Sequence, residues 1–207
     1  MKKNLETKSL VLIAMFGAIA TLLMLFEFPL VFIAPQFYEL DFSEVPVLIG
    51  TFALGPAAGV IIEFLKIVIN LIINGTDTAY VGELANFLVG LIFILPAGII
   101  YRHHRTKKGA YCGLAAGTLA LTAGSCLVNG LILLPWYAGH FFAAAGGMEA
   151  LVAFGSAIHP SIDSAWDFVL LCVAPFNLLK GILVSVVTAL LYKRVSFLIK
   201  GHGRDGR

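Results

Sequence analysis

The segment Glu39–Pro56 reads ELDFSEVPVLIGTFALGP and determines the topology of the whole chain. Its three acidic side chains stand before an apolar run that the pair Gly55-Pro56 ends. That run has about 10 residues, whereas one helix that crosses a bilayer needs about 20. A second apolar run, 57–73, follows at once. The topology therefore depends on whether the two runs make one membrane crossing or two.

The composition is that of an integral membrane protein. Of the 207 residues, 59% are hydrophobic and 13% are charged, and the mean hydropathy is +0.94. Soluble domains carry about 25% charged residues. The apolar residues form long runs and not alternating segments of about 10 residues, so we expect an all-α membrane protein. The first run lacks a small-residue cleavage site and is interpreted as a retained span.

The basic residues lie in three clusters, which hold twelve of the fourteen lysines and arginines. Short loops rich in Lys and Arg stay cytoplasmic, so an even number of spans must separate consecutive clusters. One span over 44–73 would give three crossings between the first two clusters, which is an odd number. A hairpin broken at Gly55-Pro56 gives four crossings, so the hairpin is favoured. The clusters are Lys2, Lys3 and Lys8; Arg102, Arg105, Lys107 and Lys108; and Lys193, Arg194, Lys200, Arg204 and Arg207.

The hairpin interpretation predicts six transmembrane helices in one domain, 1–207, with both termini cytoplasmic. The approximate bounds are 9–28, 44–55, 57–73, 83–102, 109–137 and 165–193. The outer connections would be 29–43, 74–82 and 138–164, which contain acidic residues and no Lys or Arg. Irregular backbone at membrane depth persists only against protein or a water-filled cavity. We therefore expect a polar cavity near the outer end of the short second helix.

Two lysines fall inside the predicted spans. Lys180 lies about 20 Å deep, too far for its side chain to reach the surface. An intramembrane charge costs at least about 2.5–3.5 kcal/mol and indicates a functional site by default. The alternative is an ion pair with a carboxylate on a neighbouring helix. For Lys66, local neutralisation by Glu63, three residues earlier, is the favoured interpretation.

Amide side chains accompany Lys180 in the predicted spans. Asn177 shares its helix face, Asn129 lies in the fifth helix, and Asn86 shares a face with Glu83 at the start of the fourth. Amides both donate and accept, so they can bind a heterocycle edge that does the same. The alternative for each is an interhelical hydrogen bond worth about 0.6 kcal/mol. The Cys and His spacings predict no metal site, and no catalytic motif is present.

Two rows of small residues allow helices to approach closely. Gly109, Gly113 and Gly117 form successive GxxxG patterns on the fifth helix, and packing inside the bundle is the favoured explanation. Ala14 and Ala18 stand four apart on the first helix. This second row could serve the bundle or a partner protein.

The chain contains three motifs in this order: DFSEVPVLIGTFALGP (41–56), GELANFLVG (82–90) and PFNLLKG (175–181). Together they resemble motifs of the riboflavin-specific substrate-binding subunits of energy-coupling factor transporters. The similarity runs from residue 14 to 194. It implies a six-helix, non-enzymatic protein of the bacterial cytoplasmic membrane. Such a protein captures riboflavin from outside as its transported ligand, needs no cofactor, and works with a transmembrane coupling protein and two cytoplasmic ATPases. The alternative is a membrane flavin sensor or scaffold that is not coupled to ATPases.

The resemblance also implies roles for particular residues. It places one group around the flavin ring, namely Asn129, Asn177 and Lys180. A second group would line or close the mouth, namely Leu40, Asp41, Phe42, Gly82, Glu83 and Asn86. The family's AxxxA contact with the coupling protein falls on Ala14 and Ala18.

Overall fold

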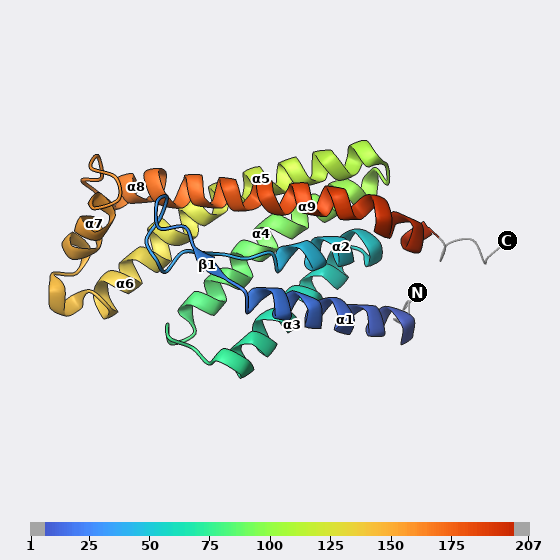
Figure 1. The fold of residues 1–207 in the computed structure, drawn as a ribbon, viewed down its shortest axis with the longest axis horizontal. Coiled ribbons are helices and arrows are strands. Elements are labelled where there is room, and N and C mark those ends of the chain that lie inside the picture. The colour runs from blue at the N-terminus through green and yellow to red at the C-terminus, as the bar shows by residue number, and fades with distance from the viewer. Residues whose placement is uncertain (1–6, 201–207) are drawn as a thin grey trace.

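The computed structural model describes the backbone of residues 7–200 and the side chains of residues 7–192, and it is helical almost throughout (Figure 1). Within the described residues, five helical segments are long and apolar enough to cross a membrane. They are α1 (Thr7–Met24), α3 (Pro56–Asn74), α4 (Val81–His103), the continuous segment Lys107–His140, and Ala165–Tyr192. The expected all-α, multi-pass membrane architecture is confirmed.

The short helix α2 (Glu44–Leu54) lies inside this bundle and not on its surface. It packs against α1, α3, α4 and α9 (Ala174–Lys200). Every residue from Glu44 to Phe52 is buried. Its 11 residues therefore end within protein, as the length of the apolar run predicted.

Gly55 and Pro56 make the reversal between α2 and α3. Gly55 has a φ of 103°, which an L side chain rarely adopts, and its N–H donates to the Thr51 carbonyl at 2.9 Å. Pro56 then occupies the first turn of α3, where its missing N–H costs nothing. The predicted break of the 44–73 region into two helices is confirmed.

The chain departs from the expected helices in three places. The first helix ends at Met24 and not at residue 28, because Phe28–Pro29 (β1) pairs with Glu39–Leu40 (β2) in a short antiparallel ladder. The expected helix 109–137 runs from Lys107 to His140. The connection 138–164 contains a helix of its own, α7 (Met148–Ser156), after a short 3₁₀ turn at Ala143–Ala145 (η2).

Two long helical segments each contain a π turn. In the first, α5 (Lys107–Val128) passes through Asn129–Leu133 (η1) into α6 (Leu134–His140). In the second, α8 (Ala165–Phe168) passes through Val169–Val173 (η3) into α9. A proline follows each turn, Pro135 and Pro175. Proline lacks an N–H and its ring clashes with the carbonyl four residues earlier, so the helix widens locally instead of breaking.

Glycines on α5 allow close contact with α4. A Cβ at Gly113 would lie 2.6 Å from the Ala97 carbonyl oxygen, and one at Gly117 would lie 2.7 Å from that of Phe93. The glycine row therefore serves packing within the bundle, as favoured from the sequence. The row at Ala14 and Ala18 is exposed on α1.

We predict that Gly113→Ala lowers the free energy of unfolding by about 1–3 kcal/mol, because α4 and α5 must separate to admit the methyl group. Thermal unfolding in detergent measures this. The matched control is Gly139→Ala on α6, where a Cβ meets nothing within 4 Å. This control should be neutral or stabilising by up to about 1 kcal/mol. Equal stability of the two variants would contradict the close-packing argument.

Candidate ligand-binding pocket

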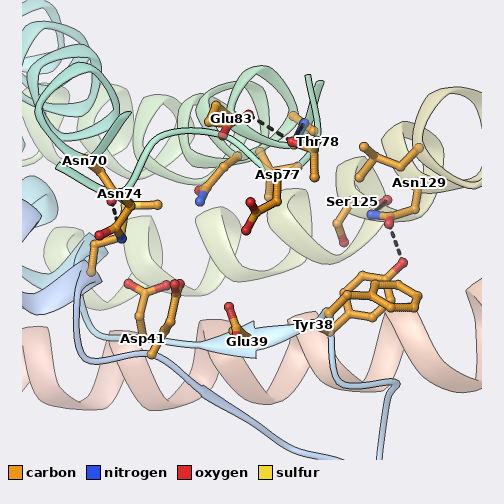
Figure 2. Close-up of a pocket in the computed structure, with 18 of the residues that line it drawn as sticks. Tyr38, Glu39, Asp41, Asn70, Asn74, Asp77, Thr78, Glu83, Ser125 and Asn129 are labelled. Carbon is orange, nitrogen blue, oxygen red and sulfur yellow. Dashed lines mark hydrogen bonds between the residues drawn. The ribbon is translucent and has the colours of Figure 1, made fainter. Parts of the chain in front are cut away.

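A polar cavity of about 330 Å³ opens beside the N-terminal end of α2. Figure 2 shows its walls: segment 37–41, the end of α3 with the loop after it, the start of α4, and the region where α5 meets η1. The start of α9 closes the remaining side. Pockets for small molecules have volumes of about 300–1,000 Å³, so this cavity is of the size that holds one. The polar cavity expected from the short second helix is present.

An ion pair forms one wall of the pocket. Lys180 Nζ donates to Asp41 Oδ2 at 2.7 Å, and the Ser43 N–H donates to Asp41 Oδ1 at 2.7 Å. Burial acts to raise the pKa of Asp41, but the ammonium groups of Lys180 and Lys66 outweigh it and lower this pKa to about 2. Asp41 is therefore an anion at neutral pH. Lys180 is thus in an ion pair, as the alternative interpretation from the sequence had it, but the carboxylate lies on the segment before α2 and not on a neighbouring helix.

Two amides of the pocket lining are already oriented. Asn129 Oδ1 accepts from the Tyr38 hydroxyl at 2.6 Å, and Asn129 Nδ2 donates to the Ser125 carbonyl at 2.8 Å (Figure 2). Asn177 Nδ2 donates to the Val173 carbonyl at 2.9 Å. Each amide keeps further hydrogen-bonding capacity for a ligand. The anchoring bonds hold both side chains in fixed orientations.

The π turns explain where these amides stand. Asn129 is the first residue of η1, and the carbonyl that anchors Asn177 belongs to the last residue of η3. The two turns contact each other. π turns inside helices are frequent at functional sites, since the extra residue changes the direction of the side chains around it. The prolines that follow the turns thus help to shape the pocket wall.

The loop between α3 and α4 forms the rim of the pocket. The Thr78 hydroxyl donates to Glu83 Oε2 at 3.0 Å and accepts from the Gly82 N–H at 2.9 Å. Asn74 Nδ2 donates to Asn70 Oδ1 at 2.9 Å (Figure 2). A Cβ at Gly82 would lie 2.7 Å from the Thr78 hydroxyl. The rim is therefore held by hydrogen bonds that a larger residue at 82 would disturb.

Carboxylates outnumber cations around the cavity. Among the described lining residues the only cation is Lys180, and the carboxyl groups are Glu27, Glu39, Asp41, Asp77 and Glu83. Partial burial, followed by the carboxylates of Glu39 and Asp41, raises the pKa of Glu27 to about 7. Lys180 is already paired with Asp41. This electrostatic field suits a neutral ligand better than an anionic one.

Seven of the nine residues assigned to the site from the sequence line this one cavity: Asp41, Gly82, Glu83, Asn86, Asn129, Asn177 and Lys180. The other two do not. Leu40 is buried in the core with Tyr38, and Phe42 packs between two core clusters, so both anchor the segment that carries Asp41. Their expected role at the mouth of the site stays a prediction.

Sequence reasoning missed several lining residues. They include Phe37, Tyr38, Asn70, Ser125, Tyr137 and Phe176. Asn70 and Ser125 are polar residues inside apolar runs, and the rule that selected Asn129 would have found them. The aromatic residues carry no such signal, because aromatic residues are common throughout this chain. Only the tertiary structure brings them to the pocket.

The fold and the pocket define a class: a helical, multi-pass membrane protein with a polar cavity of the size of a small molecule. Residues 8–192 match the family described as ECF transporter, substrate-specific component, and the chain belongs to this family. Curated relatives of this chain are named as transporters, so this is a family of transport proteins and not of enzymes.

Several relatives cover nearly the whole chain. The chain is 35% identical over 197 residues to riboflavin transporter RibU of Staphylococcus aureus (strain TCH60), covering 94% of both proteins. It is 33% identical over 189 residues to riboflavin transporter FmnP of Bacillus subtilis (strain 168), covering 91% of this chain and 92% of the relative. A solved structure of the S component of a bacterial ECF transporter superposes with a TM-score of 0.73 at 33% identity, covering 94% and 99% of the two chains.

We predict that Glu27 makes stability depend on pH. Its folded pKa of about 7 lies above the ordinary glutamate pKa of 4.5. Its contribution to the free energy of unfolding is therefore fully present below about pH 4.5 and is lost as the pH rises through about 7. Glu27→Gln should remove this loss. The free energy of unfolding of the variant should therefore rise relative to that of the wild type between about pH 5 and pH 8. The gain should not exceed about 1 kcal/mol, because the side chain is only partly buried and solvent screens its charge.

Thermal unfolding of both proteins in detergent across this pH range measures the effect. The control is Glu149→Gln, which changes an exposed glutamate on α7. Parallel pH profiles for wild type and Glu27→Gln would contradict the prediction.

Proposed function

We propose that this protein is the riboflavin-binding component of an ECF-type vitamin transporter in the bacterial cytoplasmic membrane. The pocket carries the proposal: two anchored amides and an ion-paired lysine surround a cavity that aromatic side chains also line. The similarity to other proteins also supports the proposal, because relatives that cover nearly the whole sequence are named riboflavin transporters.

The chemistry of riboflavin fits these walls. The isoalloxazine ring has an edge of alternating hydrogen-bond donors and acceptors, which Asn129 and Asn177 can match. Its flat apolar faces suit aromatic neighbours, and Tyr38, Tyr137 and Phe176 line the cavity. Riboflavin carries no net charge, so the carboxylates around the mouth do not repel it. In this proposal Lys180 donates to a ring carbonyl or nitrogen while it remains beside Asp41.

The proposed topology has six crossings, with α2 and α3 as a hairpin and both termini in the cytoplasm. The pocket would then open to the outside, because it lies near the ends of α1, α3 and α4 that are opposite the basic segment 102–108. The ends of α1 and α9 that carry the chain termini lie at the same end of the bundle (Figure 1). This arrangement agrees with the distribution of basic residues.

The proposed partners are a transmembrane coupling protein and two cytoplasmic ATPases, which would supply the energy for uptake. Ala14 and Ala18 are exposed on α1, whereas Gly17 beside them packs against Leu65, with its Cβ position 3.2 Å from that of Leu65. Small exposed residues on an apolar helix let another helix approach closely. This surface of α1 is the proposed contact with the coupling protein.

Quenching of riboflavin fluorescence by the purified protein tests the ligand. We predict that Lys180→Met weakens binding at least about tenfold, which corresponds to about 1.4 kcal/mol. The control is Lys107→Met, an exposed lysine far from the pocket. The double variant Asp41→Asn/Lys180→Met removes both charges, so it separates loss of a ligand contact from the effect of an unpaired Asp41. Unchanged affinity in folded Lys180→Met would contradict a ligand role, and no quenching by the wild type would refute riboflavin.

We predict that Ala14→Trp leaves riboflavin affinity unchanged and abolishes vitamin uptake, because the indole prevents close approach of the coupling protein. Uptake by cells that depend on external riboflavin measures this. The control is Ala115→Trp, which makes the same change at an exposed alanine on α5. Normal uptake by Ala14→Trp would disprove this docking surface, whereas loss of binding would indicate misfolding.

A further inference from the structure

A second group of charged residues lies buried below the pocket, where α2, α3 and α4 meet. Lys66 Nζ lies 2.6 Å from Glu44 Oε1 and 2.7 Å from Glu63 Oε1. Lys66 and Glu63 have no exposed surface, and Glu44 is 5% exposed. The local pair of Lys66 and Glu63 expected from the sequence is present, and Glu44 joins it from a separate helix. We call these three residues the buried triad.

The charges of the described interior do not balance if every group is ionised. Three buried carboxyl groups, Asp41, Glu44 and Glu63, face two ammonium groups, those of Lys66 and Lys180. The segment of α4 against the triad contributes Gly90 and no charge. An uncompensated charge in a membrane interior is very costly, and such groups bind a counter-ion or a proton instead. One added positive charge restores neutrality.

The hydrogen bonds identify which carboxyl group lacks support as an anion. Asp41 accepts from Lys180 and from the Ser43 N–H. Glu44 Oε1 accepts the hydrogen bond of Lys66 Nζ. Within the described part of the chain, Glu63 Oε1 lies 2.7 Å from Lys66 Nζ without the geometry of a hydrogen bond, and Glu63 Oε2 and Glu44 Oε2 have no hydrogen-bond partner. Glu63 is therefore the one carboxyl group of the three that accepts no hydrogen bond, and it is fully buried.

The neighbouring cavity argues against a metal ion as the missing charge. A second cavity of about 30 Å³ lies between the triad and the pocket, and Glu44, Asn86, Asn177 and Lys180 line it. The Lys180 ammonium would repel a metal cation there. A proton on Glu63 needs no cavity and removes the charge where it is least supported.

We propose that Glu63 is a proton-binding site: it is held as a neutral carboxylic acid, and Glu44 and Lys66 form the ion pair beside it. The charged groups of the interior then form two matched pairs, Glu44 with Lys66 and Asp41 with Lys180. Asn86, Asn177 and Lys180 line both the small cavity and the pocket, so the proton keeps the charge below the ligand site constant. The ligand-free protein can be tested, so this proposal stands apart from the riboflavin proposal.

Infrared spectroscopy of the protein in detergent detects a protonated carboxyl group through its carbonyl stretch. Measurement at about pH 8 leaves Glu27 mostly ionised, since its pKa is about 7. We predict that the wild type shows the band of a buried carboxylic acid and that Glu63→Gln removes it. Glu149→Gln, an exposed glutamate on α7, should leave it intact. Absence of the band in the wild type, or its persistence in Glu63→Gln, would overturn the proposal.

Thermal unfolding locates the proton within the triad. Glutamine resembles a neutral glutamic acid, so Glu63→Gln should unfold within about 2 °C of the wild type. Glu44→Gln deprives Lys66 of its hydrogen-bonded carboxylate and should unfold at least about 4 °C lower than Glu63→Gln. The opposite order would place the proton on Glu44. Failure of Glu63→Gln to fold would show that Glu63 acts as an anion.

Discussion

The structure depends on the ion pair between Asp41 and Lys180. It joins the segment before α2 to the N-terminal part of α9, residues separated by 139 positions in the chain. Removing two charges from water carries a desolvation cost of several kcal/mol per ion, which only good geometry and further hydrogen bonds offset. The Ser43 N–H supplies one such bond to Asp41. The pair therefore determines the position of the segment that forms one pocket wall, and it keeps a lysine beside the site.

The length of α2 follows from the same constraint. Asp41 and Glu44 must remain beside Lys180 and Lys66, so the helix that follows Asp41 begins inside the bundle and has only 11 residues before Gly55. Because α2 does not fill the thickness of the bundle, space remains at its N-terminal end, and polar side chains from α3, α4, α5 and α9 line it. A short helix and a deep pocket are two consequences of one arrangement of charges.

Another part of the pocket wall is shaped by backbone irregularity. Pro135 and Pro175 follow two π turns that contact each other, and these turns set the positions of Asn129 and Asn177. Each amide is fixed by a bond to its own helix, so little side-chain freedom remains to be lost when a ligand binds. The pocket thus combines a wall positioned by an ion pair with a wall positioned by the backbone. Such preorganisation lowers the entropic cost of binding a small molecule.

The sequence by itself determined the membrane class, the break at Gly55-Pro56 and part of the polar lining, because apolar length, glycine geometry and buried charge obey local rules. The sequence also indicated Lys180 as a site residue, since a lysine inside a membrane span cannot be explained as an ordinary solvent-exposed side chain. It did not determine that Asp41 is the partner of Lys180, that Leu40 and Phe42 face the core, or that Glu44 joins Lys66. Those contacts join segments far apart in the chain, and only the packing of α2 against α3 and α9 decided them. A charged residue inside a membrane span can be identified from the sequence, but tertiary packing determines which residue it pairs with.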